Sequence, residues 1–353
     1  MQGMCDASCS RCESISRRAA LQRTLLVSAR QAAPCAERGA DAWVMRAMQN
    51  HANFAREHGM PHTFSSALVD ADYEGAWNKV AYLSKLMRAA LYQNGTRLDW
   101  ILWADWDLVF ADLSFELPLE EYSARGARLV VGGDPAGIGA KDAAPADYLK
   151  LNTGLVLLRV HPWSLALLNR MLRQAGRSRA ERRRRALDVQ KSVSNLCVGC
   201  IDDQAVLLEM LRNEPDRWAY YAHLERRFPL QGFFEDYAGA LRDAPFAAAD
   251  ELNEQPAHGS HVPLRAPTAH PLAPLRRRVF GSLRVPLSVH FAGCQLCSGK
   301  GPPEKTPRCW AELRRTIRFA EDQAMRPLGL RHQSGTQNQS MDSDGPLQPI
   351  VAR

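Results

Sequence analysis

Short apolar runs alternate with longer segments of helical periodicity along most of the chain. Thr24–Ser28 is apolar and β-favouring, which predicts a buried strand, and residues 41–58 carry spaced apolar side chains, as a helix packed on a sheet does. Within Tyr73–Tyr92 apolar residues recur every three or four positions, which predicts a second amphipathic helix.

Three further strands are predicted by the same reasoning. Trp100–Ala104 is apolar throughout, as in a strand covered on both faces, and Ala127–Gly132 and Gly154–Arg159 follow it, the last before a helix from Pro162 to Gln174. Strands that alternate with helices imply crossover connections and a mainly parallel sheet flanked by helices. The predicted fold class is therefore α/β and Rossmann-like, with ligands at the carboxyl ends of the strands.

Polar and irregular segments set the domain boundaries. Residues 1–22 lack apolar periodicity and are predicted to be a disordered Cys/Arg-rich tail, and residues 333–353, rich in Gln, Ser, Asn and Gly, a second disordered tail. Between them we expect one catalytic domain over residues 23–332, with loop insertions near 176–200 and 244–284.

The charge balance excludes little beyond nucleic-acid binding. The formal net charge is +7, and much of the excess lies in Arg182–Arg185 and Arg276–Arg278, typical of solvated loops. There is no aromatic-interleaved basic stripe or zinc-finger spacing, so no nucleic-acid partner is expected. No apolar run reaches the roughly 18 residues that span a bilayer, and the Cys-rich tail is where we expect a lost membrane anchor.

Two carboxylates stand at the end of the apolar run 100–104. Asp105 and Asp107 flank Trp106, and such acids are costly to bury unless a cation neutralises them. A divalent cation that also binds the diphosphate of a nucleotide sugar would do so, whereas the alternative is an ordinary turn or helix cap.

Two other places offer polar groups near predicted element ends. His290 follows the apolar stretch 285–289, and an imidazole ligand suits Mn²⁺ better than Mg²⁺, although a lone His is often structural. Asp202, Asp203 and Gln204 open an apolar-periodic helix, where they either cap it or project into a site.

Nine cysteines and two glycosylation triplets, at Asn94 and Asn338, favour an oxidising secretory compartment. The spacing of Cys5, Cys9 and Cys12 resembles a radical iron–sulfur motif, but too few residues precede it to form a strand. A four-thiolate zinc site would need two CxxC pairs about ninety residues apart in sequence, so local disulfides are the preferred interpretation. Those pairs are Cys197 with Cys200 and Cys294 with Cys297.

Several motifs follow one another in order along the chain: Leu25–Cys35, Gly75–Lys79, Trp100–Leu113, Leu151–Gly154 with Arg159 and Trp163–Leu165, Asp202–Gln204, His290–Cys297, Arg308–Cys309 and Phe319–Gln323. Read in this order, they resemble a Golgi family of glycosyltransferases that includes xyloglucan xylosyltransferases, galactomannan galactosyltransferases and yeast mannan-type transferases. Together they cover roughly residues 24–332.

The resemblance implies a GT-A-type fold and a retaining α-glycosyltransferase. It would move xylose, galactose or mannose from a nucleotide-diphosphate donor, UDP in preference to GDP, to a glycan or polysaccharide acceptor in the presence of Mn²⁺. Placement in the Golgi membrane also follows from the resemblance alone, and a homo- or hetero-oligomer with other glycosyltransferases is left open.

The site residues implied by the resemblance fall into three groups. The metal ligands would be Asp105, Asp107 and His290, and the catalytic residues near the donor sugar would be Asp202, Asp203 and Gln204. The donor-binding residues would be Ser28, Lys79, Asp105, Asn152, Gly293 and Lys300.

Three departures from the family pattern bear on activity. Gln295 stands where plant members carry a Lys that meets the diphosphate, Trp106 is bulkier than usual, and Gln231–Phe234 replaces a His-Gly-Tyr-Trp type segment. A catalytically weakened scaffold that partners an active transferase is therefore the alternative function, and a sugar-nucleotide hydrolase is the third. For the transferase, the residues alone allow attack on the same face as the leaving group or a covalent intermediate on Asp203. Same-face attack is preferred because the resemblance supplies no well-established nucleophile.

Overall fold

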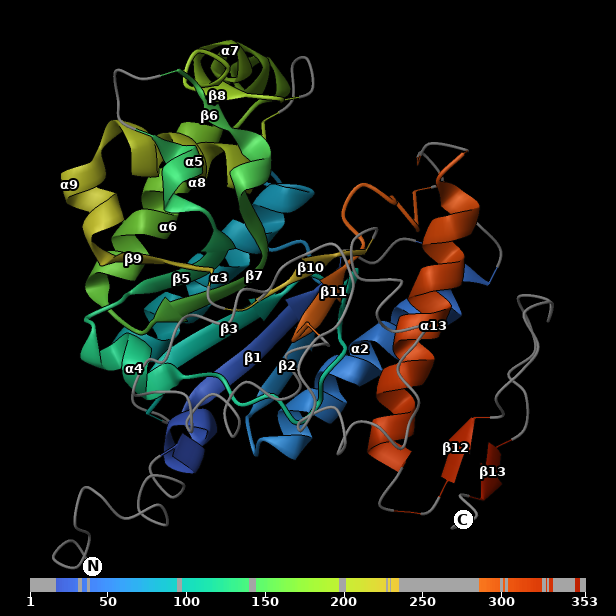
Figure 1. Ribbon diagram of the computed structural model, residues 1–353. Coiled ribbons are helices and arrows are strands. Elements are labelled where there is room, and N and C mark those ends of the chain that lie inside the picture. Colours follow the sequence, from blue (N-terminus) through green and yellow to red (C-terminus); the bar gives the residue numbers. More distant parts are fainter. Residues whose placement is uncertain are drawn as a thin grey trace, which may run out of the picture. The chain divides into compact units, whose positions relative to one another are not determined.

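The computed structural model describes residues 17–30, 34–36, 39–93, 97–139, 144–196, 201–226, 228, 230–234, 286–298, 301, 304–325, 328, 330–332 and 347–349 (Figure 1). The chain divides into two compact units, and each is assembled from separated stretches of sequence. The first unit comprises Met1–Ala32, Gly59–Ala104 and Pro118–Arg227, and the second comprises Ala33–His58, Asp105–Leu117 and Phe228–Arg353.

The first unit is built on a six-stranded sheet with the order β2-β1-β3-β7-β5-β9. Its strands are β1 (Thr24–Ala29), β2 (His62–Ser65), β3 (Trp100–Ala104), β5 (Leu129–Gly133), β7 (Leu151–Arg159) and β9 (Ala222–Glu225). β1 is parallel to β2 and β3, and β5 is parallel to β9, whereas β7 is antiparallel to both β3 and β5. The mainly parallel α/β sheet expected of a GT-A-type fold is confirmed, and β7 is its one reversed strand among the described residues.

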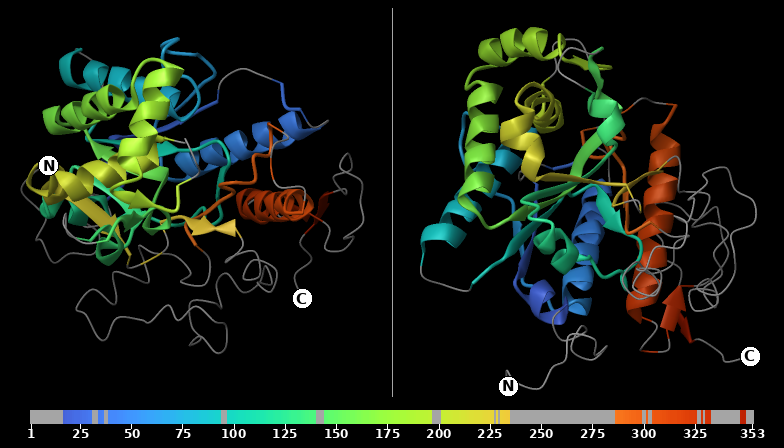
Figure 2. Two further views of the ribbon diagram at one scale, coloured as in Figure 1. Left: turned by 90° about the horizontal axis from the view of Figure 1, so that it is seen from above. Right: turned by 60° about the vertical axis from the view of Figure 1, so that its left-hand side comes forward.

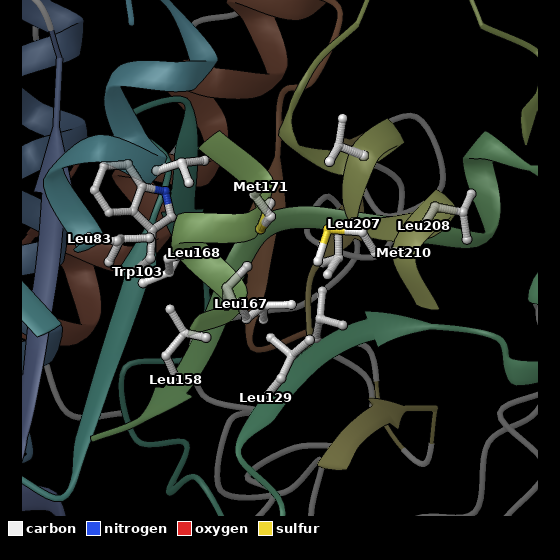
Figure 3. Close-up of a cluster of buried hydrophobic side chains, with 14 of the residues drawn as sticks. Leu83, Trp103, Leu129, Leu158, Leu167, Leu168, Met171, Leu207, Leu208 and Met210 are labelled. Atoms are coloured by element: carbon white, nitrogen blue, oxygen red, sulfur yellow. The ribbon is translucent and has the colours of Figure 1, made fainter. Parts of the chain in front are cut away.

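Three helices cover one face of this sheet. These are α3 (Ala76–Tyr92), α6 (Pro162–Ala175) and α8 (Asp203–Asn213), and their apolar faces meet side chains from β1, β3, β5 and β7 in one buried cluster. Figure 3 shows part of this cluster, with Trp103, Leu129 and Leu158 of the sheet beside the leucine and methionine side chains of α6 and α8. The predicted strands and helices therefore come together through the apolar periodicity that predicted them.

Shorter elements complete the first unit, and one of them corrects a sequence expectation. They are α4 (Leu119–Ala124), α5 (Pro135–Ile138), β6 (Ala146–Asp147), the 3₁₀ turn η1 (Tyr148–Lys150), α7 (Arg179–Val189), β8 (Val193–Ser194), α9 (Pro215–Trp218) and η2 (Ala219–Tyr221). α7 lies in the Arg-rich segment 176–200, which was predicted to be a loop. It is a helix because Ser178 and Glu181 form a capping box at its start.

The second unit contains α2 (Ala40–Glu57), the short strands β4 (Leu108–Phe110), β10 (Gly232–Phe233) and β11 (Ser288–His290), and the long helix α13 (Thr306–Met325). β11 pairs in parallel with β10 and antiparallel with β4. α13 is one continuous helix in both views of Figure 2. A separate buried cluster joins α2, β4, β11 and α13.

Both predicted tails differ from expectation where the structure describes them. Residues 17–22 are helical rather than part of a disordered tail, and they bury Ala20 and Leu21. β13 (Leu347–Pro349) lies in the predicted carboxyl-terminal tail and pairs antiparallel with β12 (Leu330–His332). The predicted insertion 244–284 lies outside the described residues.

Candidate functional site

The Asp-x-Asp motif begins directly after Ala104, the last residue of β3. A turn follows, because the Leu108 amide donates to the Asp105 carbonyl at 3.0 Å, and β4 starts at Leu108. The two carboxylates are therefore held by a tight connection between two buried strands. Trp106, between them, is partly buried against the core cluster of the second unit.

His290 brings a third metal-type ligand to this motif within the second unit. β11 pairs with β4 so that His290 lies opposite Leu108, and the Phe291 amide donates to the Asp107 carbonyl at 2.9 Å. His290 Nε2 lies 3.3 Å from Asp107 Oδ1 and 3.9 Å from Asp105 Oδ2. The three ligand atoms all lie within 4.8 Å of one another.

The chemistry of these donors fits a divalent cation. Two carboxylate oxygens and one imidazole nitrogen suit Mn²⁺ better than Mg²⁺, whose ligands are almost always oxygen. The His290 side chain is 8% exposed, while those of Asp105 and Asp107 are 25% and 20% exposed. One side of the cluster is thus buried in protein, and the carboxylates keep some access to solvent, as a site that binds a metal and a ligand together requires.

The backbone after His290 turns sharply. Gly293 has φ = 78° and Gln295 has φ = 47°, so this loop uses the left-handed region twice within three residues. Gln295, at the position where the resemblance led us to expect a Lys, lies in that strained turn, and its side chain accepts from the Ser298 hydroxyl at 3.2 Å. The predicted donor-binding residue Lys300 lies outside the described residues.

Two disulfides fix the segment that carries His290. Cys294 is bonded to Cys309 of α13, and Cys297 is bonded to Cys35 near the start of α2. These pairings differ from the expected local disulfides, since one of them closes a separation of 262 residues. They also exclude the four-thiolate zinc site in this state, because two of its four ligands are oxidised; Cys197 and Cys200 lie outside the described residues.

Asp202 and its neighbours form an acidic cluster in the first unit. Asp202 is the N-cap of α8, and its Oδ1 accepts from the Ala205 amide at 2.8 Å. Its Oδ2 accepts from the Tyr148 hydroxyl at 2.6 Å. Burial, together with the adjacent Asp203 carboxylate, raises the pKa of Asp202. The capping alternative drawn from the sequence is therefore confirmed for Asp202, and its role in a site stays a prediction.

Asp203 forms a buried ion pair with Lys79. Lys79 Nζ lies 2.7 Å from Asp203 Oδ2, and each side chain is 8% exposed. The same ammonium donates to the Thr153 carbonyl at 3.0 Å and lies 5.8 Å from the Trp103 ring centroid. The helix α3, the helix α8 and the strands β3 and β7 are thus joined at one charged centre.

Gln204 completes this centre by bridging two elements. Its amide donates to the Tyr148 carbonyl at 3.0 Å, and its oxygen accepts from the Thr153 amide at 3.3 Å. Asn152 lies next to Thr153 on β7, where its side-chain oxygen accepts from the Gly154 amide at 2.8 Å. Ser28 is fully buried on β1. The structure therefore brings Lys79, Asp203 and Gln204 together, and these residues lie in one packed network.

Sequence reasoning missed three supporting residues. Tyr148 holds Asp202, while Asn50 and His51 of α2 bond to the backbone of β4. A histidine and an asparagine among the apolar positions of a predicted helix were the available signal, because buried polar side chains need partners.

Comparison with known proteins finds similarity to glycosyltransferases. Residues 20–123 match the model of the galactosyl transferase GMA12/MNN10 family. The chain is 30% identical over 312 residues to "Probable glycosyltransferase 3" of Oryza sativa subsp. japonica, covering 88% of this chain and 58% of that protein. It is 28% identical over 331 residues to "Probable glycosyltransferase 6" of Oryza sativa subsp. indica, covering 88% and 65%.

The chain is similar to the galactosyl transferase GMA12/MNN10 family over residues 20–123. It spans about three fifths of the length of the rice relatives it matches.

Two solved structures are similar at low sequence identity. One is a glycosyltransferase involved in the glycosylation of the major capsid of PBCV-1, with 11% identity, a TM-score of 0.39, and coverage of 63% of this chain and 90% of that one. The other is an active-site mutant of LgtC, with 12% identity, a TM-score of 0.33, and coverage of 76% and 87%. Among the described residues, no helix is both long enough and apolar enough to cross a membrane.

Proposed function

We propose that this chain is a metal-dependent retaining α-glycosyltransferase that moves a hexose or pentose from a nucleotide-diphosphate donor to a glycan or polysaccharide acceptor. The observation that carries the proposal is the convergence of Asp105, Asp107 and His290, whose ligand atoms lie within 4.8 Å of one another. The family match over residues 20–123 and the similarity to the rice proteins support the same activity.

Asp105, Asp107 and His290 would hold Mn²⁺ through two oxygens and one nitrogen. When bound, this cation supplies a positive charge that offsets the charge developing on a departing diphosphate. UDP is the proposed nucleotide in preference to GDP, and xylose, galactose and mannose are the candidate sugars. The chain's own contribution is to keep the three ligands in register through the β4–β11 pairing.

The acidic cluster of the first unit would act on the donor sugar. Asp203 is paired with the Lys79 ammonium, and an ion-paired carboxylate is a weaker nucleophile than a free one. This pairing favours attack by the acceptor on the same face as the leaving group over a covalent intermediate on Asp203. Gln204 would orient the sugar, because its amide is anchored at both ends by the backbone of Tyr148 and Thr153.

Placement in the Golgi membrane remains part of the proposal, and so does association with other glycosyltransferases. The two disulfides support an oxidising compartment, because such bonds persist in secretory compartments and are rare in the cytosol.

The test is titration calorimetry of the purified chain with UDP, with and without Mn²⁺. Binding is expected only with Mn²⁺ and is expected to be lost in Asp105→Ala and Asp107→Ala. Asp216→Ala removes an exposed carboxylate of α9 and serves as the matched control. If neither UDP nor GDP binds the unaltered chain, the transferase proposal fails in favour of the catalytically weakened scaffold.

If a nucleotide does bind, transfer is screened with UDP-xylose, UDP-galactose and GDP-mannose in the presence and absence of glycan acceptors. Product that forms only with an acceptor supports the transferase. Free sugar released without any dependence on acceptor would identify a hydrolase instead.

A further inference from the structure

Among the described residues, the strand β4, which follows the Asp-x-Asp motif, pairs with another strand along only one edge. The backbone carbonyl of Asp107 accepts from the Phe291 amide at 2.9 Å, and the Ala111 amide donates to the Leu287 carbonyl at 2.9 Å. Alternate backbone groups of this segment therefore face β11. Because strand residues alternate in direction, the backbone groups of Leu108 and Phe110 face the other way. In a buried strand these groups need partners from elsewhere.

Asn50 of α2 supplies two of those partners. Its side-chain amide donates to the Phe110 carbonyl at 2.9 Å, and its side-chain oxygen accepts from the Phe110 amide at 2.8 Å. This paired arrangement imitates the two bonds that a neighbouring strand would make. Asn50 is 1% exposed, so water does not compete for these bonds.

His51, the next residue of α2, supplies the partner for Leu108. Its Nε2 lies 2.7 Å from the Leu108 carbonyl, and since a carbonyl accepts, this nitrogen carries the proton. The ring is fully buried and meets the Phe110 ring edge-on at 5.4 Å. Leu108 directly follows Asp107 and lies opposite His290, so this bond acts on the peptide beside two proposed metal ligands.

Packing reinforces the same contact. The ring of Phe54, one helical turn beyond Asn50, stacks on the ring of Phe110 with centroids 4.0 Å apart and an interplanar angle of 3°. Both rings are fully buried. One face of α2 thus fixes β4 by two polar side chains and one aromatic ring.

We propose that His51, assisted by Asn50, is a positioning residue of the cation site. It fixes the position of β4 relative to β11, and with it the separation of Asp107 from His290. This inference rests on the proposed function for the identity of the cation, while the geometry that it concerns exists without one. Outer-shell groups that orient metal ligands typically change metal affinity by about 10- to 100-fold when removed.

The first experiment needs no metal. Amide hydrogen exchange is measured at Phe291, whose amide donates to Asp107, in the metal-free protein. His51→Leu keeps the volume and removes the donor, and we expect exchange at Phe291 to accelerate about tenfold or more as the contact opens locally. His51→Gln keeps an N–H donor and is expected to restore most of the protection.

Gln323 of α13 gives the matched control. Its side-chain amide donates to the Ala111 carbonyl at 2.6 Å, and its side-chain oxygen accepts from the Leu113 amide at 3.1 Å. It therefore bonds to the same backbone segment as His51, but a few residues farther from the proposed metal ligands. Gln323→Leu is expected to change exchange near Ala111 and Leu113 while leaving Phe291 within about threefold of wild type.

The second experiment measures Mn²⁺ affinity by electron paramagnetic resonance. Affinity is expected to fall about tenfold in His51→Leu and to stay within about threefold of wild type in His51→Gln and Gln323→Leu. If His51→Leu does not fold, the isosteric Asn50→Asp, which loses the donor to Phe110, replaces it in both experiments.

The outcomes separate the two proposals. Unchanged Phe291 exchange in His51→Leu, or an equal change in Gln323→Leu, overturns the positioning role whatever the metal result. Absence of Mn²⁺ binding in the unaltered chain would defeat the cation part of the proposed function, while the exchange experiment would still decide the role of His51.

Discussion

His290 and Asp107 are joined twice: His290 Nε2 lies 3.3 Å from Asp107 Oδ1, and the peptide after His290 donates to the Asp107 carbonyl at 2.9 Å. The side-chain contact of His290 and the backbone bond from the adjoining Phe291 together restrict the geometry of these two ligands. The identity of the third ligand should therefore control which cation binds.

His290→Asp is expected to shift the site from Mn²⁺ toward Mg²⁺. The change replaces a nitrogen ligand by an oxygen ligand, which Mg²⁺ prefers, and the Mn²⁺/Mg²⁺ affinity ratio should fall about tenfold. Competition titrations measure the ratio directly. His290→Ala, which only removes a ligand, should weaken both cations together, and a ratio that stays constant in His290→Asp would show that His290 is not a ligand.

His58 should make the second unit sensitive to mild acid. Burial lowers the pKa of His58 from 6.5 to about 4, with its bond to Leu113 acting in the opposite direction. Because this pKa is lower in the folded state than in the unfolded state, the unfolded chain takes up the proton first as the pH falls. Stability is therefore complete above pH 6.5 and is lost as the pH falls toward 4. The loss approaches about 3 kcal/mol of the free energy of unfolding, since each pKa unit corresponds to about 1.4 kcal/mol.

The measurement compares urea unfolding of wild type and His58→Gln between pH 7 and pH 4. The variant should lose less stability over this window, because glutamine does not titrate. His62→Gln, in the first unit, should reduce the acid loss in the same direction, because burial lowers the pKa of His62 as well. Parallel pH profiles for wild type and His58→Gln would contradict the prediction.

Periodicity predicted most of the first unit because its elements bury apolar side chains in a regular pattern. The predicted strand at 100–104 and the helix 162–174 match β3 and α6 to within a residue. The direction of β7 could not be predicted, because a buried apolar run has the same sequence pattern in a parallel and in an antiparallel strand. The Arg-rich helix α7 was missed although Ser178 and Glu181 have the spacing of a capping box, so the signal was present.

The sequence predicted the proposed metal ligands of the candidate site, but it did not predict the residues that hold them in place. Asp105, Asp107 and His290 were identified by their positions after apolar runs, and the structure brings them together. The pairing of Cys35 with Cys297 and the contacts of His51 depend on residues far apart in sequence, which local spacing does not encode. Lys79 is buried although its side chain is charged, because Asp203, far from it in sequence, neutralises it.

Gly176 should tolerate alanine poorly. Its φ is +78°, and an added Cβ would lie 2.7 Å from the Glu181 Cβ at the start of α7. Gly126 is the matched control, because its φ is +71° and nothing lies within 4 Å of an added Cβ. We expect Gly126→Ala to cost about 1 kcal/mol from backbone conformation alone and Gly176→Ala about 1–3 kcal/mol more from overpacking, measured by thermal unfolding. Equal costs would mean that the α7 junction relaxes freely.

The Lys79–Asp203 pair should show strong coupling in a double-mutant cycle. Both side chains are 8% exposed, so removing either one leaves a buried charge without its main neutralising partner. Lys79→Met and Asp203→Leu should each lower the free energy of unfolding by about 3–5 kcal/mol, whereas the double variant should be far less destabilised than their sum, because an apolar pair of similar volume replaces the ions. Arg170 and Glu214, paired at 3.0 Å with side chains 34% and 31% exposed, provide the control cycle, with an expected coupling below about 1 kcal/mol. A coupling for Lys79 and Asp203 no larger than this control would mean that water screens the centre and that the ion pair does not organise the first unit.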